Sequence, residues 1–597
     1  MMNNPLALTS LHPMPRFLLN RLTRLNILSA WYDEWLAAPS QQTPAPQADA
    51  QTDGGHRFLN FVLEKLDADL HVTNPEQLSQ IPATGPLLIV ANHPLGAMEG
   101  MLLSRLLLRH RPDLRVLTNE LLLVFPEFKD LFIGVDVLNP NAQSKNMKGM
   151  REANRHLGNG GALLIFPAGT VSHMRLPGGS IEDSPWSSMV GRLALKHGAN
   201  CISFRINGRN NTLFYLAGLV HKRLRTLLLP RAMLDKQGSQ LQISVGKVID
   251  KDAIKQLGSP TCVTQYLRLN CDLLSDSISA SDHQRTALPA TQPDANRRQA
   301  LAAQFDALQP YKVAEHQNYA VYCTPFQALG CIAEQLALER EQTFRQAGEG
   351  TGKPLDRDQF DSDYWHILAW DHDAQRLIGG YRVVRAETVV KARGLDGLYS
   401  HTLFHFDEAF LRALGPAIEL GRSFVTSAYQ RNPRALDLLW KGIGAFVLQN
   451  SDCHTLFGCV SISQRYSPLA RALLADTFLH NNVADEEMRK LVRPVARERR
   501  QRTHWDRELL LACADTAIFN KLLGSHDAES RVPTLIRHYL AMNGKFVDFS
   551  VNNSFNRSLD GLIFVDLRNA PPKYLQRYLG KEPAERLQQL WRTGHAE

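Results

Sequence analysis

Short apolar runs alternate with helical patterns through most of this chain, and no other feature constrains its fold as much. The runs "PLLIVA", "ALLIF" and "CISFRI" have the length of buried strands, and "EGMLLSRLLLRH" and "GMREANRHL" have helical spacing. Such alternation is typical of α/β domains. A polar segment at 275–297 interrupts it, and a second α/β segment follows. Since 597 residues are too many for one core, we predict two α/β domains.

Shifts in composition predict where these parts begin and end. We place the domains at 56–275 and 315–597 and a linker at 276–314, because the stretch between them is polar and poor in apolar residues. Residues 1–55 form an N-terminal segment, in which 16–38 has leucines at helical spacing with arginines between them. A basic amphipathic helix of this kind fits two settings, an anionic lipid surface or the face of its own domain.

The charge and the cysteine content limit the possible partners and the cellular compartment of the protein. Its 67 lysines and arginines outnumber its 59 aspartates and glutamates, which favours an acidic partner such as an anionic membrane, an acidic protein or nucleic acid. The 8 cysteines lack metal spacing, as is typical of reduced cytosolic thiols. No stretch approaches the roughly 18 apolar residues of a membrane span, and no signal peptide pattern is seen. We expect a peripheral protein at the cytoplasmic face of the inner membrane.

A histidine and a glutamate stand six positions apart where a strand turns into a helix. His93 follows "PLLIVA" in a turn with Pro94 and Gly96, and Glu99 falls in the first turn of the next helix. The turn lets the carboxylate orient the imidazole and stabilise its protonated form, as a base that deprotonates a hydroxyl requires. The alternative is a structural histidine followed by a glutamate that the helix dipole favours. The pair alone does not separate the two.

Two further segments extend this pattern. "IFPAGT" and "CISFRINGRNN" follow in order, each at an apolar strand. With the His93 turn they resemble the glycerolipid acyltransferase family, and most closely its ornithine-lipid O-acyltransferases, which place the acid one position later. The resemblance implies that His93 is the general base, that Glu99 orients it and that a thioester donates the acyl group. It also implies three residues that shape the acceptor and donor pocket: Pro167, Gly169 and Thr170.

Two departures from the glycerophosphate-using members bear on the acceptor. Ala168 stands where they have a glutamate, and the intermediate stretch "LFIGVDVLNPN" has no arginine. Because a phosphate dianion needs fixed positive charge or paired donors, we expect an acceptor hydroxyl without a neighbouring phosphate. The stretch "HKRLRTLLLPRAML" at 221–234 carries basic residues among leucines, and it fits either a membrane boundary or a solvated helix face.

Charged residues recur in the second α/β segment. An arginine and an acidic cluster precede one apolar strand, and two arginines and a glutamate interrupt others. Buried charges persist only when they are paired, so we expect carboxylates to meet arginines there. The residues are Arg340, Asp356, Asp358, Asp361, Arg382, Glu419 and Arg422. Taken alone, they also fit a structural ion-pair network.

The order of these residues resembles ornithine acyl-carrier-protein N-acyltransferases, which are related to acyl-homoserine lactone synthases and have the acyl-CoA N-acyltransferase (GNAT) fold. The resemblance implies a mixed-sheet C-terminal domain in which Glu419 is the base, directly or through water, and the arginines and aspartates bind substrate. The segment 532–567 also resembles the end of that family, with a looser acidic pair. An amide near 424–426 is expected to donate to the thioester oxygen.

Both resemblances in one chain imply a bifunctional ornithine lipid synthase. The C-terminal domain would N-acylate ornithine with a 3-hydroxyacyl chain, and the N-terminal domain would acylate the hydroxyl of the resulting lyso-ornithine lipid. The implied donor is acyl carrier protein or coenzyme A thioester, with acyl carrier protein docking at basic patches such as 151–155 or 497–502. The other implied partner is a membrane surface. No nucleic acid, metal or further cofactor is expected.

Other interpretations stay open. The same domains fit a lysophospholipid acyltransferase joined to an N-acyltransferase for glycine or serine. The C-terminal half also fits a non-catalytic acyl-sensing module or homoserine lactone synthesis. A membrane-lytic protein is disfavoured, because neither a secretion signal nor a series of pore-length strands is found.

Overall fold

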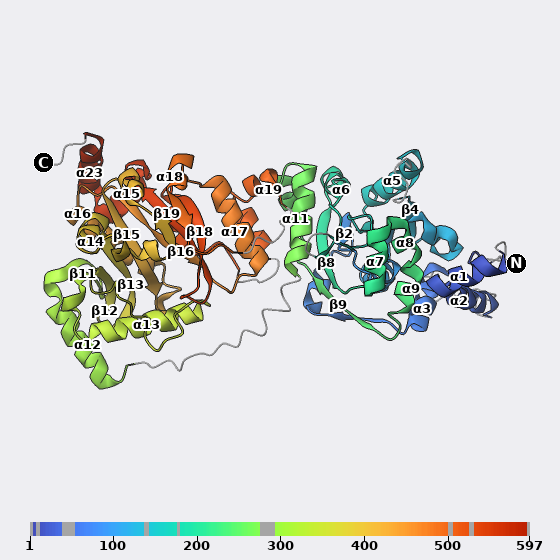
Figure 1. Ribbon diagram of the computed structural model, residues 1–597, viewed down its shortest axis with the longest axis horizontal. Helices are drawn as coiled ribbons and strands as arrows, with labels where there is room; N and C mark the ends of the chain where they lie inside the picture. The colour runs from blue at the N-terminus through green and yellow to red at the C-terminus, as the bar shows by residue number, and fades with distance from the viewer. Residues whose placement is uncertain are drawn as a thin grey trace. The chain divides into compact units, whose positions relative to one another are not determined.

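The computed structural model of the chain describes residues 4–6, 12–38, 54–136, 143–175, 179–274, 293–498, 505–524 and 530–593. Its elements form two compact units. Unit 1 comprises Met1–Ile278 and His504–Glu529, and unit 2 comprises Ser279–Thr503 and Ser530–Glu597. Each unit is built on one large β-sheet, as the alternating pattern predicts (Figure 1).

The sheet of unit 1 has seven described strands in the order β1-β9-β8-β2-β5-β3-β4, and neighbours are parallel except β8 and β9. The central strand β2 is buried along its whole length, which explains why its sequence is continuously apolar rather than alternating. The predicted strands "PLLIVA", "ALLIF" and "CISFRI" are confirmed as β2, β5 and β8. The bounds are β1 (Asp69–Val72), β2 (Leu87–Ala91), β3 (Arg115–Asn119), β4 (Phe132–Val135), β5 (Ala162–Ile165), β8 (Asn200–Asn207) and β9 (Gln240–Val245).

Helices follow most of these strands. Because α4 begins directly after the turn that ends β2, that turn lies at the carboxyl edge of the sheet, where α/β proteins place their sites. A short hairpin of β6 (His173–Met174) and β7 (Ile181–Glu182) stands beyond β5. The helices are α3 (Gly54–Leu66), α4 (Ala97–Leu108), α5 (Gln143–Gly158), α6 (Met189–His197), α7 (Thr212–Val220), α8 (Lys222–Leu227), α9 (Leu229–Leu234), α10 (Lys251–Gln256) and α11 (Pro260–Leu273).

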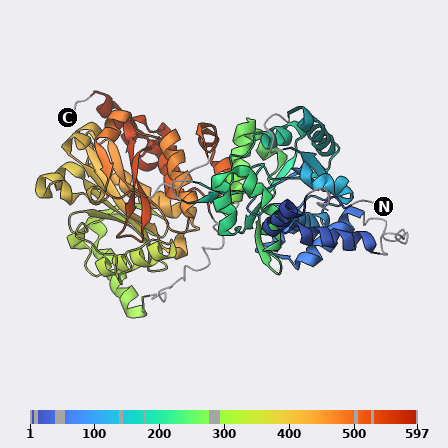
Figure 2. The same ribbon diagram turned by 45° about the vertical axis from the view of Figure 1, so that its right-hand side comes forward.

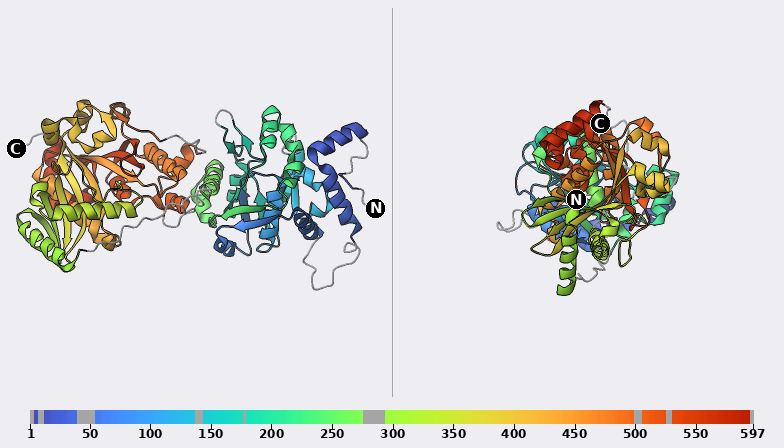
Figure 3. Two further views of the ribbon diagram at one scale, coloured as in Figure 1. Left: turned by 60° about the horizontal axis from the view of Figure 1, so that its bottom comes forward. Right: turned by 90° about the vertical axis from the view of Figure 1, so that its left-hand side faces the viewer.

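The predicted N-terminal helix at 16–38 is two helices. α1 (Pro13–Thr23) and α2 (Leu25–Ala37), blue in Figure 3, meet at Arg24, whose φ of 56° breaks the helical path. α2 packs on its own unit, because Tyr32 and Trp35 are buried and both donate to Glu127. α1 instead leaves apolar side chains exposed, among them Phe17 at 63%. α2 therefore has one of the two settings that the sequence left open, the face of its own domain, and contact of α1 with lipid stays a prediction.

A helical pair from the second half of the sequence belongs to unit 1. α19 (Arg507–Ala512) and α20 (Thr516–Leu523) pack against α11, and Ser259 Oγ donates to Glu508 across 249 positions of sequence. The predicted domain at 315–597 is thus interrupted, and a local pattern cannot reveal such a distant contact. The predicted linker at 276–314 also needs correction. It contains α12 (Ala295–Ala307), whose Phe305 stacks on Trp370 of unit 2.

The sheet of unit 2 has eight described strands in the order β10-β11-β12-β13-β15-β16-β19-β18, all antiparallel neighbours except β15 and β16. The β15–β16 ladder ends at Leu420 and Gly458, although both strands continue, so the sheet opens there. The bounds are β10 (Lys312–His316), β11 (Tyr319–Pro325), β12 (Trp365–Asp371), β13 (Arg376–Arg385), β15 (Ala417–Val425), β16 (Thr455–Ile462), β18 (Lys545–Asn552) and β19 (Ser558–Asp566). The mixed sheet confirms the predicted fold class.

Helices cover this sheet (Figure 2), and the contacts of α16 run along β11, β12 and β13. The helices are α13 (Ile332–Gln346), α14 (Ala386–Arg393), α15 (Glu408–Leu414), α16 (Pro433–Gln449), α17 (Pro468–Asn481), α18 (Glu486–Lys490), α21 (Thr534–Ala541), α22 (Pro572–Leu579) and α23 (Lys581–Thr593). None of the described helices in either unit is both long and apolar enough to cross a membrane.

Candidate active sites

The His93 ring and the Glu99 carboxylate meet at the carboxyl end of β2. Nδ1 of His93 lies 2.9 Å from Oε1 of Glu99, and the same oxygen accepts the Leu95 amide at 3.0 Å. Glu99 is 1% exposed, whereas the His93 side chain is 18% exposed. Because Nδ1 faces the carboxylate, the opposite nitrogen, Nε2, is left for a substrate proton. The structure thus brings the predicted base and its orienting acid together in the geometry that base catalysis needs.

Three polar residues that the sequence pattern did not indicate hold the His93 turn. Asn92 exchanges two hydrogen bonds with the backbone of Ile206 in β8, at 2.9 and 2.7 Å. Asp183 accepts the His93 amide at 3.3 Å, and Ser172 donates to the His93 carbonyl through its amide at 2.7 Å and its hydroxyl at 3.1 Å. These bonds fix the backbone on both sides of the imidazole. Because Asp183 lies 90 positions from His93, no local spacing connects them.

The three predicted pocket residues lie on the turn after β5, beside the His93 ring. Phe166 contacts His93 with the ring centroids 4.6 Å apart. Gly169 has a φ of 66°, which a glycine adopts without strain, and its amide closes the turn onto the Phe166 carbonyl. Pro167 and Thr170 bond to serines that follow β7. The structure therefore places these residues on the same turn as Phe166, which contacts the base, and their own contact with substrate stays a prediction.

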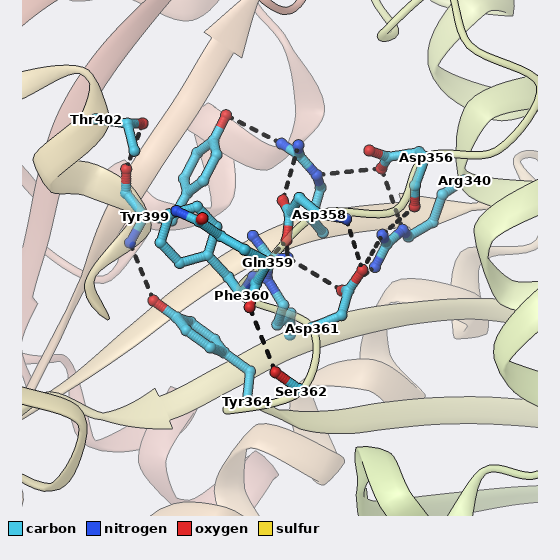
Figure 4. A network of polar contacts seen from close by, with 12 residues as sticks. Arg340, Asp356, Asp358, Gln359, Phe360, Asp361, Ser362, Tyr364, Tyr399 and Thr402 are labelled. Carbon is cyan, nitrogen blue, oxygen red and sulfur yellow. Dashed lines mark hydrogen bonds and ion pairs between the residues drawn. The ribbon is translucent and has the colours of Figure 1, made fainter. Parts of the chain in front are cut away.

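In unit 2, three arginines and three aspartates alternate in a ring of ion pairs (Figure 4). Four of the six residues are buried, and Arg422 and Asp358 are half-buried. Each arginine contacts two aspartates, and each aspartate contacts two arginines. The contacts are Arg340 with Asp356 (3.1 Å) and Asp361 (2.8 Å), Arg382 with Asp358 (2.5 Å) and Asp361 (3.0 Å), and Arg422 with Asp356 (3.1 Å) and Asp358 (3.3 Å). Three positive and three negative charges balance one another, which is the condition for burying them.

The ring confirms the prediction that carboxylates and arginines pair in this domain, and it shows that these residues form a structural ion-pair network. Burial by itself raises the pKa of Asp361, but Arg340 and Arg382 lower it by more than burial raises it, so the pKa lies below its ordinary value. The same balance, with Arg382 and Arg422, lowers the pKa of Asp358. Both carboxylates are therefore charged and already paired. Substrate binding by the six residues stays a prediction.

Glu419 lies on β15 with both of its oxygens occupied. It accepts hydrogen bonds from the Tyr364 hydroxyl, from the Tyr399 amide at 3.1 Å and from the Ser400 amide at 2.7 Å, and it is 1% exposed. Burial raises its pKa despite these bonds. To take a proton directly from an amine, Glu419 would have to give up one of these three hydrogen bonds. The assignment of Glu419 as the base stays a prediction, and its contacts give it a positioning role for the 399–402 turn.

The opening between β15 and β16 lies next to the ring of ion pairs. Arg422, just past the last ladder pair, has a φ of 49°, and its Nη1 donates to the Tyr399 hydroxyl at 3.0 Å. Its guanidinium also lies over the Phe555 ring, 4.9 Å from the centroid. The Thr426 amide, one of the predicted oxyanion donors, already donates to the Ile378 carbonyl at 2.9 Å. Of the segment 424–426, this amide is therefore not free for a thioester oxygen.

Two carboxylates outside the ring interact electrostatically with Arg422, and neither has an ion-pair partner among the described residues. Asp560 on β19 is 2% exposed and accepts hydrogen bonds from Asn552 at 2.9 Å and from Ser558 at 2.7 Å. Glu349 follows α13. Burial and then Asp560 raise the pKa of Glu349 to about 8, although Arg422 opposes the shift. The sequence pattern singled out neither residue. Glu349 lies outside the segments that carry the resemblance, and Asp560 lies within 532–567 but was not identified there as a site residue.

The wild type is expected to lose stability as the pH rises, and replacing Glu349 with glutamine is expected to abolish this loss. Because the pKa of Glu349 is raised in the native state, the native state keeps a proton that the unfolded state releases once the pH exceeds 4.5, the ordinary pKa of a glutamate. Wild-type stability should therefore fall as the pH rises from about 5 to about 8 and level off above it, by about 1–3 kcal/mol for this partly exposed group. The measurement is urea unfolding at a series of pH values, comparing the variant with the wild type.

Glu585→Gln, at an exposed position of α23 in the same unit, is the matched control. Its stability profile should run parallel to that of the wild type. A Glu349→Gln profile that also ran parallel to the wild type would show that Glu349 is ionised in the native state at neutral pH.

Comparison with known proteins places both parts of the chain among acyltransferases. The model of an acyltransferase family matches residues 69–281, and that of an acetyltransferase (GNAT) domain matches residues 340–441. The L-ornithine N(alpha)-acyltransferase of Rhizobium meliloti is 30% identical over 241 residues, which are 39% of this chain and 73% of that protein. The chain belongs to the family of this acyltransferase. The predicted combination of an acyltransferase domain with a C-terminal GNAT domain is thus confirmed.

Two other relatives are named for N-acylation of glycine and for O-acylation of lyso-glycine lipid. The glycine N(alpha)-acyltransferase of Phocaeicola vulgatus is 29% identical over 209 residues, which are 33% of this chain and 63% of that protein. The lyso-glycine lipid O-acyltransferase of the same organism is 27% identical over 227 residues, which are 37% of this chain and 78% of that protein. The chain spans less than two thirds of the glycine N(alpha)-acyltransferases that it matches, 63% and 61% of their length.

Proposed function

We propose that this acyltransferase makes an amino lipid in two steps, N-acylation of an amino acid in unit 2 and O-acylation of the product in unit 1. The carrying observation is that the buried, oriented His93–Glu99 pair and a GNAT domain occur in one chain. The relatives add support, because they are named separately for the N-acyl and the O-acyl step.

The first step joins an amino group to a 3-hydroxyacyl thioester. The free amine attacks the thioester carbon, a C–N bond forms, the C–S bond breaks, and the thiol leaves with the proton that the nitrogen loses. The opening between β15 and β16 offers strand edges at which the extended thioester can lie. We propose that Glu419 supports this site through Tyr364 and the 399–402 turn.

The second step acylates the hydroxyl of the N-acyl product. Nε2 of His93 takes the hydroxyl proton as the oxygen attacks the second thioester, and Glu99 stabilises the imidazolium that forms. The C–S bond then breaks, and the imidazolium returns the proton to the departing thiolate. Neither acyl transfer changes an oxidation state. In the described ranges, no cluster of histidine, cysteine and acidic side chains is suited to hold a metal, and the absence of a cofactor stays a proposal.

We propose ornithine as the amino acid. Glu349 and Asp560 are carboxyl groups with raised pKa values beside a ring that is already neutral. A bound cation such as the second ammonium group of ornithine would favour their ionised forms and pair with them. Glycine is the second candidate, because several of the relatives are named for glycine or lyso-glycine lipid. Glycine has no side-chain cation to balance these carboxylates.

We further propose peripheral binding to an anionic membrane at the cytoplasmic face. Large apolar side chains are exposed on α1, α7 and α8, and α1 and α8 both contact α9 within unit 1. Basic residues lie among them. This composition is that of an interfacial surface. The exposed side chains are Met14, Phe17, Leu18, Leu22, Leu213, Leu216, Leu219, Val220, Leu224 and Leu227.

Acyl carrier protein is the proposed donor partner of both steps. Arg151 and Arg155 are exposed on α5, where an acidic protein can reach them. Arg497, from the second predicted patch, pairs with Asp548 at 3.3 Å, and the end of that patch at 499–502 lies outside the described residues.

The test is expression of the full chain in a bacterial host that lacks amino lipids, with isotope-labelled ornithine or glycine in the medium. Mass spectrometry of the lipids should show labelled ornithine bearing one amide-linked 3-hydroxyacyl chain and one ester-linked chain. A labelled glycine headgroup would establish the second candidate instead. A change confined to phospholipid acyl composition would refute the amino-lipid proposal.

A further inference from the structure

One buried arginine in unit 1 has no anionic partner. Arg225 on α8 is 8% exposed, yet its side chain makes neither a hydrogen bond nor an ion pair with any described residue, and its backbone carbonyl accepts the Leu228 amide. Other arginines as deeply buried each contact a carboxylate; they are Arg111, Arg268, Arg340, Arg382 and Arg471. A guanidinium taken out of water without a partner is costly. Arg225 is therefore expected to meet an anion that comes from outside the chain.

The surroundings of Arg225 connect it with the His93 turn. Tyr215 on α7 interacts electrostatically with both Glu99 and Arg225. The chain also touches the His93 turn four positions after Arg225, because a Cβ added at Gly96 would lie 2.8 Å from Cδ2 of Leu229. The Tyr215 hydroxyl accepts the Asn210 amide at 3.0 Å, and the Asn210 side chain donates to the Leu95 carbonyl at 3.3 Å. The stem of Arg225 packs against α7 at Gly218, where an added Cβ would lie 3.0 Å from its Cδ.

Other positive charges gather at the same place. His173, directly after Ser172, interacts electrostatically with Arg225, Arg175 and Lys222, and more weakly with the carboxylate of Asp183. Of these, Arg175 has a carboxylate, Glu182, at 3.8 Å. The core beside α7 and α8 is apolar, since Val171, Phe214 and Leu228 form one buried cluster with Tyr215. Positive charge in an apolar setting beside a base attracts an anionic group of the acceptor.

We propose that Arg225 binds the carboxylate of the N-acyl amino acid whose hydroxyl is acylated in unit 1. This inference rests on the proposed function. In such an acceptor a trans amide separates the hydroxyl-bearing part of the chain from the carboxylate, so the two ends lie about 6–7 Å apart. A carboxylate carries one charge, and its two oxygens match two parallel N–H groups of a guanidinium. Glycine and ornithine products share this carboxylate, so the site serves either headgroup.

The test compares acceptors that differ only at this group, using the purified full chain. N-(3-hydroxyacyl)glycine and the corresponding ornithine compound are offered as free acids and as carboxamides. The wild type should prefer the acids at least tenfold in kcat/KM. Arg225→Gln should raise KM for the acids about 10–100-fold, leave kcat for the acids near the wild-type value and leave the carboxamides unchanged. Arg225→Lys should recover part of the loss, and Arg223→Gln, exposed on the same helix, should behave as the wild type.

A binding arm separates this proposal from the two-step function. N-dodecanoylglycine has the carboxylate but no hydroxyl to acylate, and calorimetry should detect its binding to the wild type and a weaker binding to Arg225→Gln. If no acceptor is acylated but this difference is seen, the proposed function fails and the carboxylate site stands. Equal loss for acids and carboxamides, a raised KM for the thioester donor alone, or a wild type indifferent to amidation would each overturn the proposal. The last comparison needs no variant, so it decides even where Arg225→Gln fails to fold.

Discussion

Replacing His93 with alanine is expected to slow O-acylation by about 10²–10⁴-fold while N-acylation continues. The imidazole Nε2 is the proposed proton acceptor in unit 1, and the substitution leaves the backbone bonds to Asp183 and Ser172 in place. Cells that make the variant should therefore accumulate the mono-N-acylated amino acid. The measurement is the ratio of mono-acylated to di-acylated lipid by mass spectrometry, followed by rates with the purified chain.

Two controls keep this result interpretable. His93→Gln retains a polar partner for the buried Glu99 but not a basic ring nitrogen, so it should fold as the wild type and lose O-acylation as the alanine variant does. His71→Ala, at an exposed position of β1, should change neither step. Undiminished O-acylation by His93→Ala would contradict the assignment of the base.

The sequence predicted much of this site because its parts are local. The apolar run before His93 indicates a buried strand, and the six-residue spacing to Glu99 spans one turn and the start of a helix. Asn92, Ser172 and Asp183 escaped prediction because their bonds cross between strands or reach over about 80 to 110 positions of sequence. Local patterns specify elements, and only the fold brings such partners together.

Arg225 shows the limit in another way. The run at 221–234 predicts a membrane boundary or a solvated basic face, and Lys222 and Arg223 are indeed exposed. Arg225 itself points inward because α8 has only six residues and packs between α7 and α9. Likewise, the helix breaks at Arg24 because this residue has a left-handed backbone conformation. Since it is not a glycine, the sequence gives no sign of the break. A run of basic residues predicts that most of its side chains lie at the surface, but it does not show which single side chain is buried.

In unit 2 the motif residues were predicted individually, and their pairing as a closed ring was not. Arg382 is fully buried and contacts two aspartates, and its guanidinium lies over the Tyr364 ring at 4.9 Å from the centroid. Composition indicates that such charges must be paired. It does not show which arginine meets which aspartate, nor that the balance leaves Glu349 and Asp560 outside.

Replacing Arg382 with methionine is therefore expected to destabilise unit 2 by about 3–5 kcal/mol, because one negative charge of the ring is left uncompensated in the core. Urea unfolding, with hydrogen exchange of peptides from each unit, measures the effect and assigns it to unit 2. The exposed pair of Arg412 and Glu408 on α15 supplies the control, since Arg412→Met should cost less than about 1 kcal/mol. Adding Asp358→Asn to Arg382→Met should restore part of the loss, because the charges balance again.

The pH dependence of this loss separates a structural ring from a substrate site. The pKa values of Asp358 and Asp361 are lowered in the native state, so their stabilisation is present above the ordinary aspartate value of 3.8 and disappears as the pH falls below it. The difference between wild type and Arg382→Met should shrink accordingly toward acid pH. At neutral pH and low temperature, where the variant is still folded, a structural role leaves the KM for the amino acid unchanged. A raised KM under those conditions would instead establish Arg382 as the substrate-binding residue that the sequence resemblance implies.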